Sequence, residues 1–300
     1  MKKSLAILAA VLLAAACSEP FDLKTRRAEK TYLVVEAVLT NIPSTQTIIL
    51  SESVDFQSTG DTPYVSGAEV SVSDGEKTYT FTEREDQPGY YDSPKFFYTR
   101  GGLSYTLRIG RTLPDGTRKE YSAVEKAEEP GFDIDRVDYK YMGATADSTW
   151  ALGVWGTDRP QTGYFLISTA VNGVFAPTWA LLERAIFMPD TYFNGQSVSG
   201  FPIAFLYQTA DQMKLYGDCA KPLEKGDMVS LVAYTMTRKH YDFVMALMSA
   251  SGSGGGMLGG QPANLPTNIS GGDAMGYFAV CPVIMGSCVV GDPFKTEFDR

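Results

Sequence analysis

Residues 69–82 read EVSVSDGEKTYTFT, and this stretch decides the predicted fold class. Apolar and polar residues alternate in EVSVS (69–73) and again in TYTFT (78–82), on either side of Asp74-Gly75. Alternation with a period of two is typical of half-buried strands, and an Asp-Gly pair between two such runs predicts a tight hairpin. We therefore expect two antiparallel strands here.

Similar short strands surround this hairpin. They are expected at Tyr32–Thr40, Thr47–Ser51, Ser104–Ile109 and Lys119–Ala123, with turn residues between them. The 17 tyrosines, 16 phenylalanines and 29 glycines of the chain suit a β protein with many turns. Because helical periodicity is missing from this half, we predict an immunoglobulin-like or prealbumin-like β-sandwich over residues 31–125.

A polar run from Val124 to Gly131 marks the predicted domain boundary. Residues 132–290 are expected to form a larger β domain, a sheet or a barrel, closed by strands at Tyr277–Val280 and Val283–Met285. One helix is predicted near 238–250, because apolar residues recur there at helical spacing and Thr237 can cap its start. The chain is thus predicted to be mainly β with one α-helix.

The first residues carry the features of a secretory leader. Lys2 and Lys3 precede the apolar run Leu5–Ala16, and small residues lead directly to Cys17. The run is short for a membrane span. We predict a signal peptide at 1–16, lipid attachment to Cys17 and a polar tether over residues 17–30.

The charge balance limits the classes of partner. The whole chain has a formal charge of −9, and loss of Lys2 and Lys3 with the leader makes it two units more negative. An acidic body argues against nucleic acid and against adhesion to anionic lipid heads. The glycine-rich tract 251–260 is followed by Gln261, whereas a phosphate-binding loop would require lysine. No cofactor is predicted.

Cysteine and histidine are scarce. Beyond Cys17 there are Cys219, Cys281 and Cys288, of which the last two are the first choice for a disulfide by proximity. His240 is the only histidine, which excludes sites that need several imidazoles. Because His240 lies at the start of the predicted helix, we interpret it as a surface or capping residue. No serine has a recognisable nucleophile motif, so an enzyme is not predicted.

Two further groups are candidate binding residues. Asp133, Asp135 and Asp138 could offer oxygens to calcium, but they lack the twelve-residue loop pattern, and a solvated strand face explains them more simply.

Trp150, Trp155 and Trp179, with Tyr192 and Phe193, are candidates for stacking on a sugar, with core packing as the simpler alternative. Strand alternation places Trp150 and Trp155 on opposite faces.

Several short blocks in order carry a family resemblance. They are LVVEAVLT (33–40), VSGAEVSVSDG (65–75), PGYY (88–91), SYTLRI (104–109) and NISGG (268–272). Together with Cys17 they resemble the lipoprotein family called domain of unknown function 4249. The blocks are strand and turn elements and bring no catalytic residue with them.

The resemblance implies an outer-membrane lipoprotein that accompanies TonB-dependent transporters. Our leading hypothesis is therefore a non-enzymatic accessory or interaction subunit of an envelope transport system, held to the membrane through Cys17. The alternative is a surface lipoprotein that binds a glycan or a peptide, and the third is a hydrolase with scattered carboxylates. The side of the outer membrane stays open.

Overall fold

The computed structural model describes residues 31–54, 60–143, 149–161, 163–175, 186–191, 193–207, 223–250 and 265–299. The predicted leader, the tether with Cys17, and the residues Trp179, Tyr192 and Cys219 lie outside the described residues.

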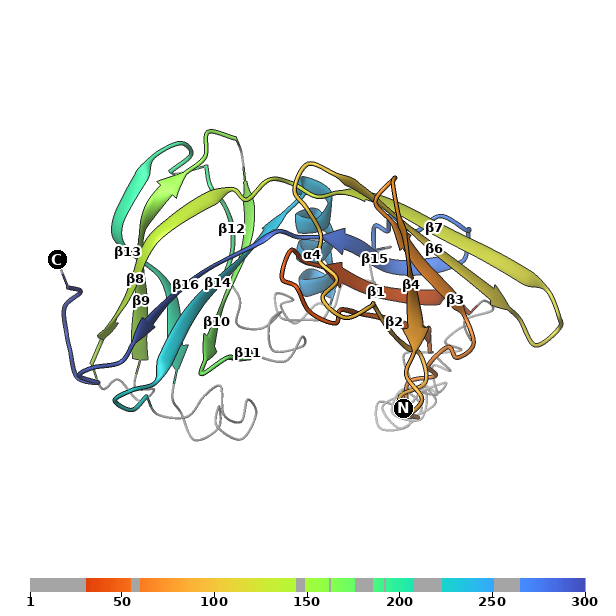
Figure 1. Ribbon diagram of the computed structural model, residues 1–300, viewed down its shortest axis with the longest axis horizontal. Coiled ribbons are helices and arrows are strands. Elements are labelled where there is room, and N and C mark those ends of the chain that lie inside the picture. Colours follow the sequence, from red (N-terminus) through yellow and green to blue (C-terminus); the bar gives the residue numbers. More distant parts are fainter. Residues whose placement is uncertain are drawn as a thin grey trace, which may run out of the picture.

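Two β units lie side by side, with helix α4 (Arg238–Ala250) between them (Figure 1). The first unit is one eight-stranded sheet in the order β15-β1-β2-β5-β4-β3-β6-β7. Its strands are β1 (Leu33–Leu39), β2 (Thr47–Glu52), β3 (Glu69–Ser73), β4 (Thr78–Glu83), β5 (Tyr90–Asp92), β6 (Ser104–Thr112), β7 (Arg118–Lys126) and β15 (Ala274–Val280). The mainly β prediction is confirmed.

The sheet of the first unit curves until its ends almost meet. Ser122 of β7 forms an antiparallel bridge with Ser270, which lies just before β15. The predicted hairpin is present, because Val70 of β3 pairs with Phe81 of β4. Alternate residues of each strand point inward, so the interior is apolar, and Leu33, Tyr91 and Phe278 are among the side chains with no exposed surface. The first unit is therefore a nearly closed, barrel-like sheet.

Strand β15 corrects one expectation. The segment Tyr277–Val280 was expected to close the second domain, but β15 runs parallel to β1, from the pair Leu33 and Ala274 to the pair Leu39 and Val280. The first unit is completed by residues near the end of the chain. Parallel neighbours need a long connection, and here residues 40–273, which include most of the second unit, form that connection.

The second unit packs two sheets face to face. Strands β13, β9 and β8 form one, and β11-β10-β14-β16 form the other, with β12 paired to β10. The bounds are β8 (Phe132–Tyr141), β9 (Thr149–Asp158), β10 (Tyr164–Val171), β11 (Val174–Phe175), β12 (Ile186–Pro189), β13 (Ser197–Tyr207), β14 (Met228–Met236) and β16 (Val283–Val289). Their inner faces share a second apolar core that includes Trp150, Leu152 and Leu231.

Helix α4 confirms the helix predicted near 238–250. The Thr237 hydroxyl accepts a hydrogen bond from the backbone amide of His240 at 3.2 Å, which is the expected N-cap. Phe243 and Val244 pack in one cluster with Tyr277 and Ala279 of β15, so the helix lies against the first unit. Among the described residues, no helix has the length and apolar character that crossing a membrane would require.

A short loop of the first unit is fastened directly to the second. The Asn41 side chain donates to the carbonyl of Val283 at 3.1 Å and accepts from its amide at 2.7 Å. Beside it, Ile42 packs against Val232 and Val283. These contacts join β16 to the loop between β1 and β2.

Candidate functional site

Trp150 and Trp155, the two predicted stacking tryptophans that the structure describes, do not form a common platform. Trp150 is 4% exposed and lies in the core, with its ring centroid 4.8 Å from that of Tyr141. Trp155 points to the opposite face, as strand alternation predicts, but the Arg136 guanidinium covers its ring at 3.7 Å and Phe298 meets it edge-on. Trp150 and Trp155 therefore offer a sugar no shared open face.

The expected disulfide does not form, because Cys281 and Cys288 are both free. Cys281 follows β15 directly, and Cys288 lies near the far end of β16. A strand rises roughly 3.3 Å per residue, so the extended chain carries the two α-carbons well beyond the ~7 Å that a disulfide allows. Closeness in sequence was misleading here.

His240 also differs from the expectation of a surface residue. It is 7% exposed, and its ring stacks on Tyr277 with centroids 5.1 Å apart. Its Nδ1 lies 3.4 Å from the Cys281 sulfur. Burial lowers the pKa of His240 to about 4 and raises the pKa of the Cys281 thiol above its ordinary range. Thr237 caps the helix, and His240 is a core residue.

A buried carboxylate connects this cluster to the first unit. Glu125 of β7 is 6% exposed and accepts hydrogen bonds from the Thr237 hydroxyl at 2.6 Å and the Asn268 amide at 3.2 Å. Burial raises the pKa of Glu125. Because Thr237 caps α4 and Asn268 precedes β15, this network joins three segments distant in sequence. We interpret it as structural.

The predicted aspartate group separates into different environments. Asp133 is exposed and forms an ion pair with Arg159 at 3.0 Å, and Asp135 is also exposed. Asp138 is buried and forms an ion pair with Lys295 at 2.5 Å. Within the residues that the structure describes, no group of three or more His, Cys, Asp or Glu side chains could hold a metal ion.

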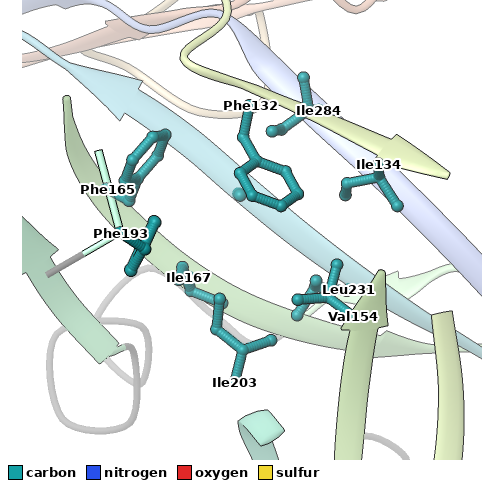
Figure 2. Close-up of a pocket in the computed structure, with 10 residues that line it drawn as sticks. Phe132, Ile134, Val154, Phe165, Ile167, Phe193, Ile203, Leu231 and Ile284 are labelled. Atoms are coloured by element: carbon teal, nitrogen blue, oxygen red, sulfur yellow. The ribbon is translucent and has the colours of Figure 1, made fainter. Parts of the chain in front are cut away.

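The core of the second unit contains a small apolar cavity. Figure 2 shows Phe132, Ile134, Phe165, Ile203 and Ile284 among the side chains that converge on it from both sheets. Its volume is about 20 Å³, and no polar side chain lines it. Ligand sites are usually hundreds of Å³ with a few polar groups for orientation. The cavity is therefore a packing gap and offers no reactive group.

The most unusual surface feature is the loop between β5 and β6. Phe96 is 76% exposed and adopts a backbone φ of +59°, a left-handed conformation that bulky residues rarely take. Tyr98 is 51% exposed, and Lys95 and Arg100 lie beside these aromatic residues. Two large rings and two cations thus face outward within six residues.

The loop is nonetheless firmly held. Phe97 points inward, with its ring 4.9 Å from that of Tyr79. The buried Gln46 side chain donates to the carbonyls of Phe97, Thr40 and Ile42 at 3.1, 2.9 and 3.2 Å, and so binds this loop to the loop between β1 and β2. Such anchoring presents the exposed rings in one geometry.

Sequence reasoning missed this loop. The run Phe96-Phe97-Tyr98 looks like any apolar strand segment, and only the structure shows that the middle ring is buried while its neighbours are exposed. The preceding Pro94-Lys95 is a turn signal that could have drawn attention to it.

The described residues thus define a two-unit β protein with structural polar clusters and an aromatic surface loop. A family model described as Domain of unknown function (DUF4249) matches residues 18–285, and the chain belongs to this family. No curated protein matches the chain.

Proposed function

We propose that this chain is a lipid-anchored outer-membrane protein that serves as a non-enzymatic accessory subunit of an envelope transport system, with a TonB-dependent transporter as the partner. The observation that carries the docking role is the anchored loop that exposes Phe96 and Tyr98. Aromatic residues and arginine are the residue types that dominate the binding energy of protein interfaces.

The left-handed conformation of Phe96 supports this proposal. Strained backbone for a non-glycine residue is unfavourable by about 1 to 3 kcal/mol, and it persists where the surrounding structure imposes it. Exposing a phenylalanine in that conformation adds no folding stability from burial. A role outside the folded monomer accounts for both features.

The chemistry of the loop indicates the kind of partner surface. Lys95 and Arg100 flank the rings on a chain whose overall charge is −9, so this edge is locally basic on an acidic body. Arg100 also forms a 3.7 Å ion pair with Asp74, which limits its movement. We propose a partner surface with an apolar pocket and acidic residues around it.

The sequence supports the membrane attachment. Lys2 and Lys3, the apolar run and Cys17 form a lipoprotein leader, and the first strand begins at Leu33, after a polar segment of suitable length for a tether. Diacylglycerol on Cys17 would hold both β units at the membrane surface. Cys17→Ser should release the protein from membranes, and firm attachment of this variant would contradict the proposal.

The docking role can be tested by co-purification of the lipidated protein in mild detergent. We expect the wild type to recover an outer-membrane transporter, and the double variant Phe96→Ala, Tyr98→Ala to recover at least tenfold less, since each hot-spot truncation weakens binding by about 1 to 3 kcal/mol.

Val124→Ala provides the matched control, because Val124 is 61% exposed on β7 and its truncation should leave recovery unchanged. Recovery of no envelope protein by the wild type, or equal recovery by the double variant, would contradict the proposal.

A further inference from the structure

Two carboxylates lie buried together at one end of the second unit. Asp158 ends β9 and is 2% exposed, while Asp190 follows β12 and is 0% exposed. They lie close enough that the charge of Asp190 acts on Asp158 and, together with burial, raises the pKa of Asp158 to about 6.

Each carboxylate uses one oxygen to shape a loop. Asp158 Oδ2 accepts a hydrogen bond from the Gly195 amide at 2.9 Å, and Asp190 Oδ2 accepts one from the Gly163 amide at 2.5 Å. The two loops are also joined through the backbone, because the Asp190 amide donates a hydrogen bond to the Gly163 carbonyl at 3.2 Å. The two loops are thus held beside each other by these residues.

Among the described residues, the other oxygen of each carboxylate has no hydrogen-bond partner. Asp158 Oδ1 and Asp190 Oδ1 are both buried and accept no hydrogen bond from any described residue. The neighbouring cation, Arg159, is engaged by Asp133 on the surface. Two buried carboxylate oxygens without a donor are unfavourable, and either a bound cation or a proton shared by the two groups would relieve this cost.

We propose that Asp158 and Asp190 form a binding site for a divalent cation, with calcium as the preferred ion. The donors are oxygens only, which suits a hard cation and disfavours zinc or copper. With two protein carboxylates, the remaining ligands would be backbone carbonyls and water. Such a sparse set of charged ligands corresponds to the weak class of calcium sites, with Kd on the order of 0.1 to 1 mM.

The test is thermal unfolding of the purified full-length chain after treatment with EDTA, with calcium chloride added up to 10 mM. Calcium that binds only the folded state should raise the Tm of the wild type by roughly 3 to 6 °C at the highest concentration. Potassium chloride at equal ionic strength controls for screening and should leave Tm unchanged. Calorimetric titration with calcium should give about one ion per chain.

Asp158→Asn and Asp190→Asn should each abolish the calcium-dependent rise in Tm. Asp133→Asn is the matched control, because this nearby carboxylate is exposed and its variant should keep the full rise. No rise and no binding heat in the wild type would overturn the proposal. A rise that persists in both variants would also overturn it, since the ion would then bind elsewhere. If a variant fails to fold, the wild-type titration and the other variant decide.

Discussion

Nδ1 of His240 lies 3.4 Å from the sulfur of Cys281, and yet the pair is unsuited to nucleophilic catalysis. A reactive cysteine needs a lowered thiol pKa beside a protonated imidazole. Burial shifts both groups the other way, with a raised pKa for Cys281 and a lowered one for His240. The contact is a neutral part of the packing between α4 and β15.

This environment predicts a dependence of stability on pH. The pKa of His240 is about 4 in the folded protein and 6.5 ordinarily, so the unfolded chain binds the proton first as pH falls. The contribution of neutral His240 to the free energy of unfolding is therefore complete above pH 6.5 and is lost as pH falls from 6.5 towards 4. Between pH 7 and 4.5 we expect the wild type to lose roughly 2 to 3 kcal/mol from this group.

Urea denaturation at the two pH values measures this loss. His240→Gln should remove it while Cys281 and Tyr277, which contact the ring, and Glu125, which accepts a hydrogen bond from Tyr277, stay in place. An unchanged pH dependence in this variant would show that another group is responsible.

Glu125→Ala should destabilise the protein by about 2 to 3 kcal/mol, because Thr237 and Asn268 lose their buried acceptor. Glu120→Ala on the same strand is the control. Its carboxylate is 66% exposed and pairs with Arg118, and such surface pairs contribute about 0 to 1 kcal/mol. Chemical denaturation of both variants checks the difference, and equal losses would refute a bridging role for Glu125.

The two described cysteines should behave as separate thiols. Without reductant, peptide mapping of the unfolded protein should find Cys281 and Cys288 both alkylated. In the native protein Cys281 should be protected, because it is 1% exposed and its thiol pKa is raised. A peptide that joins Cys281 to Cys288 under non-reducing conditions would contradict the structure.

The C-terminal segment should contribute to stability through Lys295. Lys295→Met leaves the buried Asp138 carboxylate without its cation, and we expect a loss of about 3 kcal/mol. Adding Asp138→Asn should recover part of this loss, because the uncompensated charge disappears. A double-mutant cycle from urea denaturation measures the coupling, and simple additivity would show that the pair does not interact.

Elements with strong local signals could be predicted from the sequence. The hairpin of β3 and β4 and the capped helix α4 each depend on residues within one turn or a few positions. Pairing between distant segments leaves no such signal, so β15 was assigned to the wrong unit. His240 was misplaced for the same reason, since its burial comes from β15 and cannot be seen in its own helix.

The candidate site was less predictable than the fold. The exposed rings of Phe96 and Tyr98 depend on which way each residue of a short loop points, and the buried Asp158 and Asp190 depend on two loops meeting. Of the predicted stacking residues, Trp150 lies in the core and Trp155 is covered by Arg136 and Phe298. The exposure of Phe96 and Tyr98 depends on tertiary packing, which composition does not encode.

Gly276→Ala should disrupt the pairing of β15 with β1. Gly276 has a φ of +86°, and an added Cβ would collide with the backbone of Val35. We expect a loss of at least about 3 kcal/mol, measured by urea denaturation. Gly75→Ala is the control: its φ is also positive but its surroundings are open, so only the smaller conformational effect should appear. Similar losses in the two variants would argue against close approach as the cause.

Synthesis runs from the N-terminus, so β1 through β7 leave the ribosome well before β15 exists. Until then the outer edge of β1 has unpaired amides and carbonyls, and the barrel cannot close. Strands β8 to β14 and helix α4, which lie between β7 and β15 in the chain, must be made before β15 is available to complete the first unit. A nascent chain that stalls near residue 260 would carry an open sheet, a substrate for chaperones and proteases, so maturation of both units is expected to be a single late event.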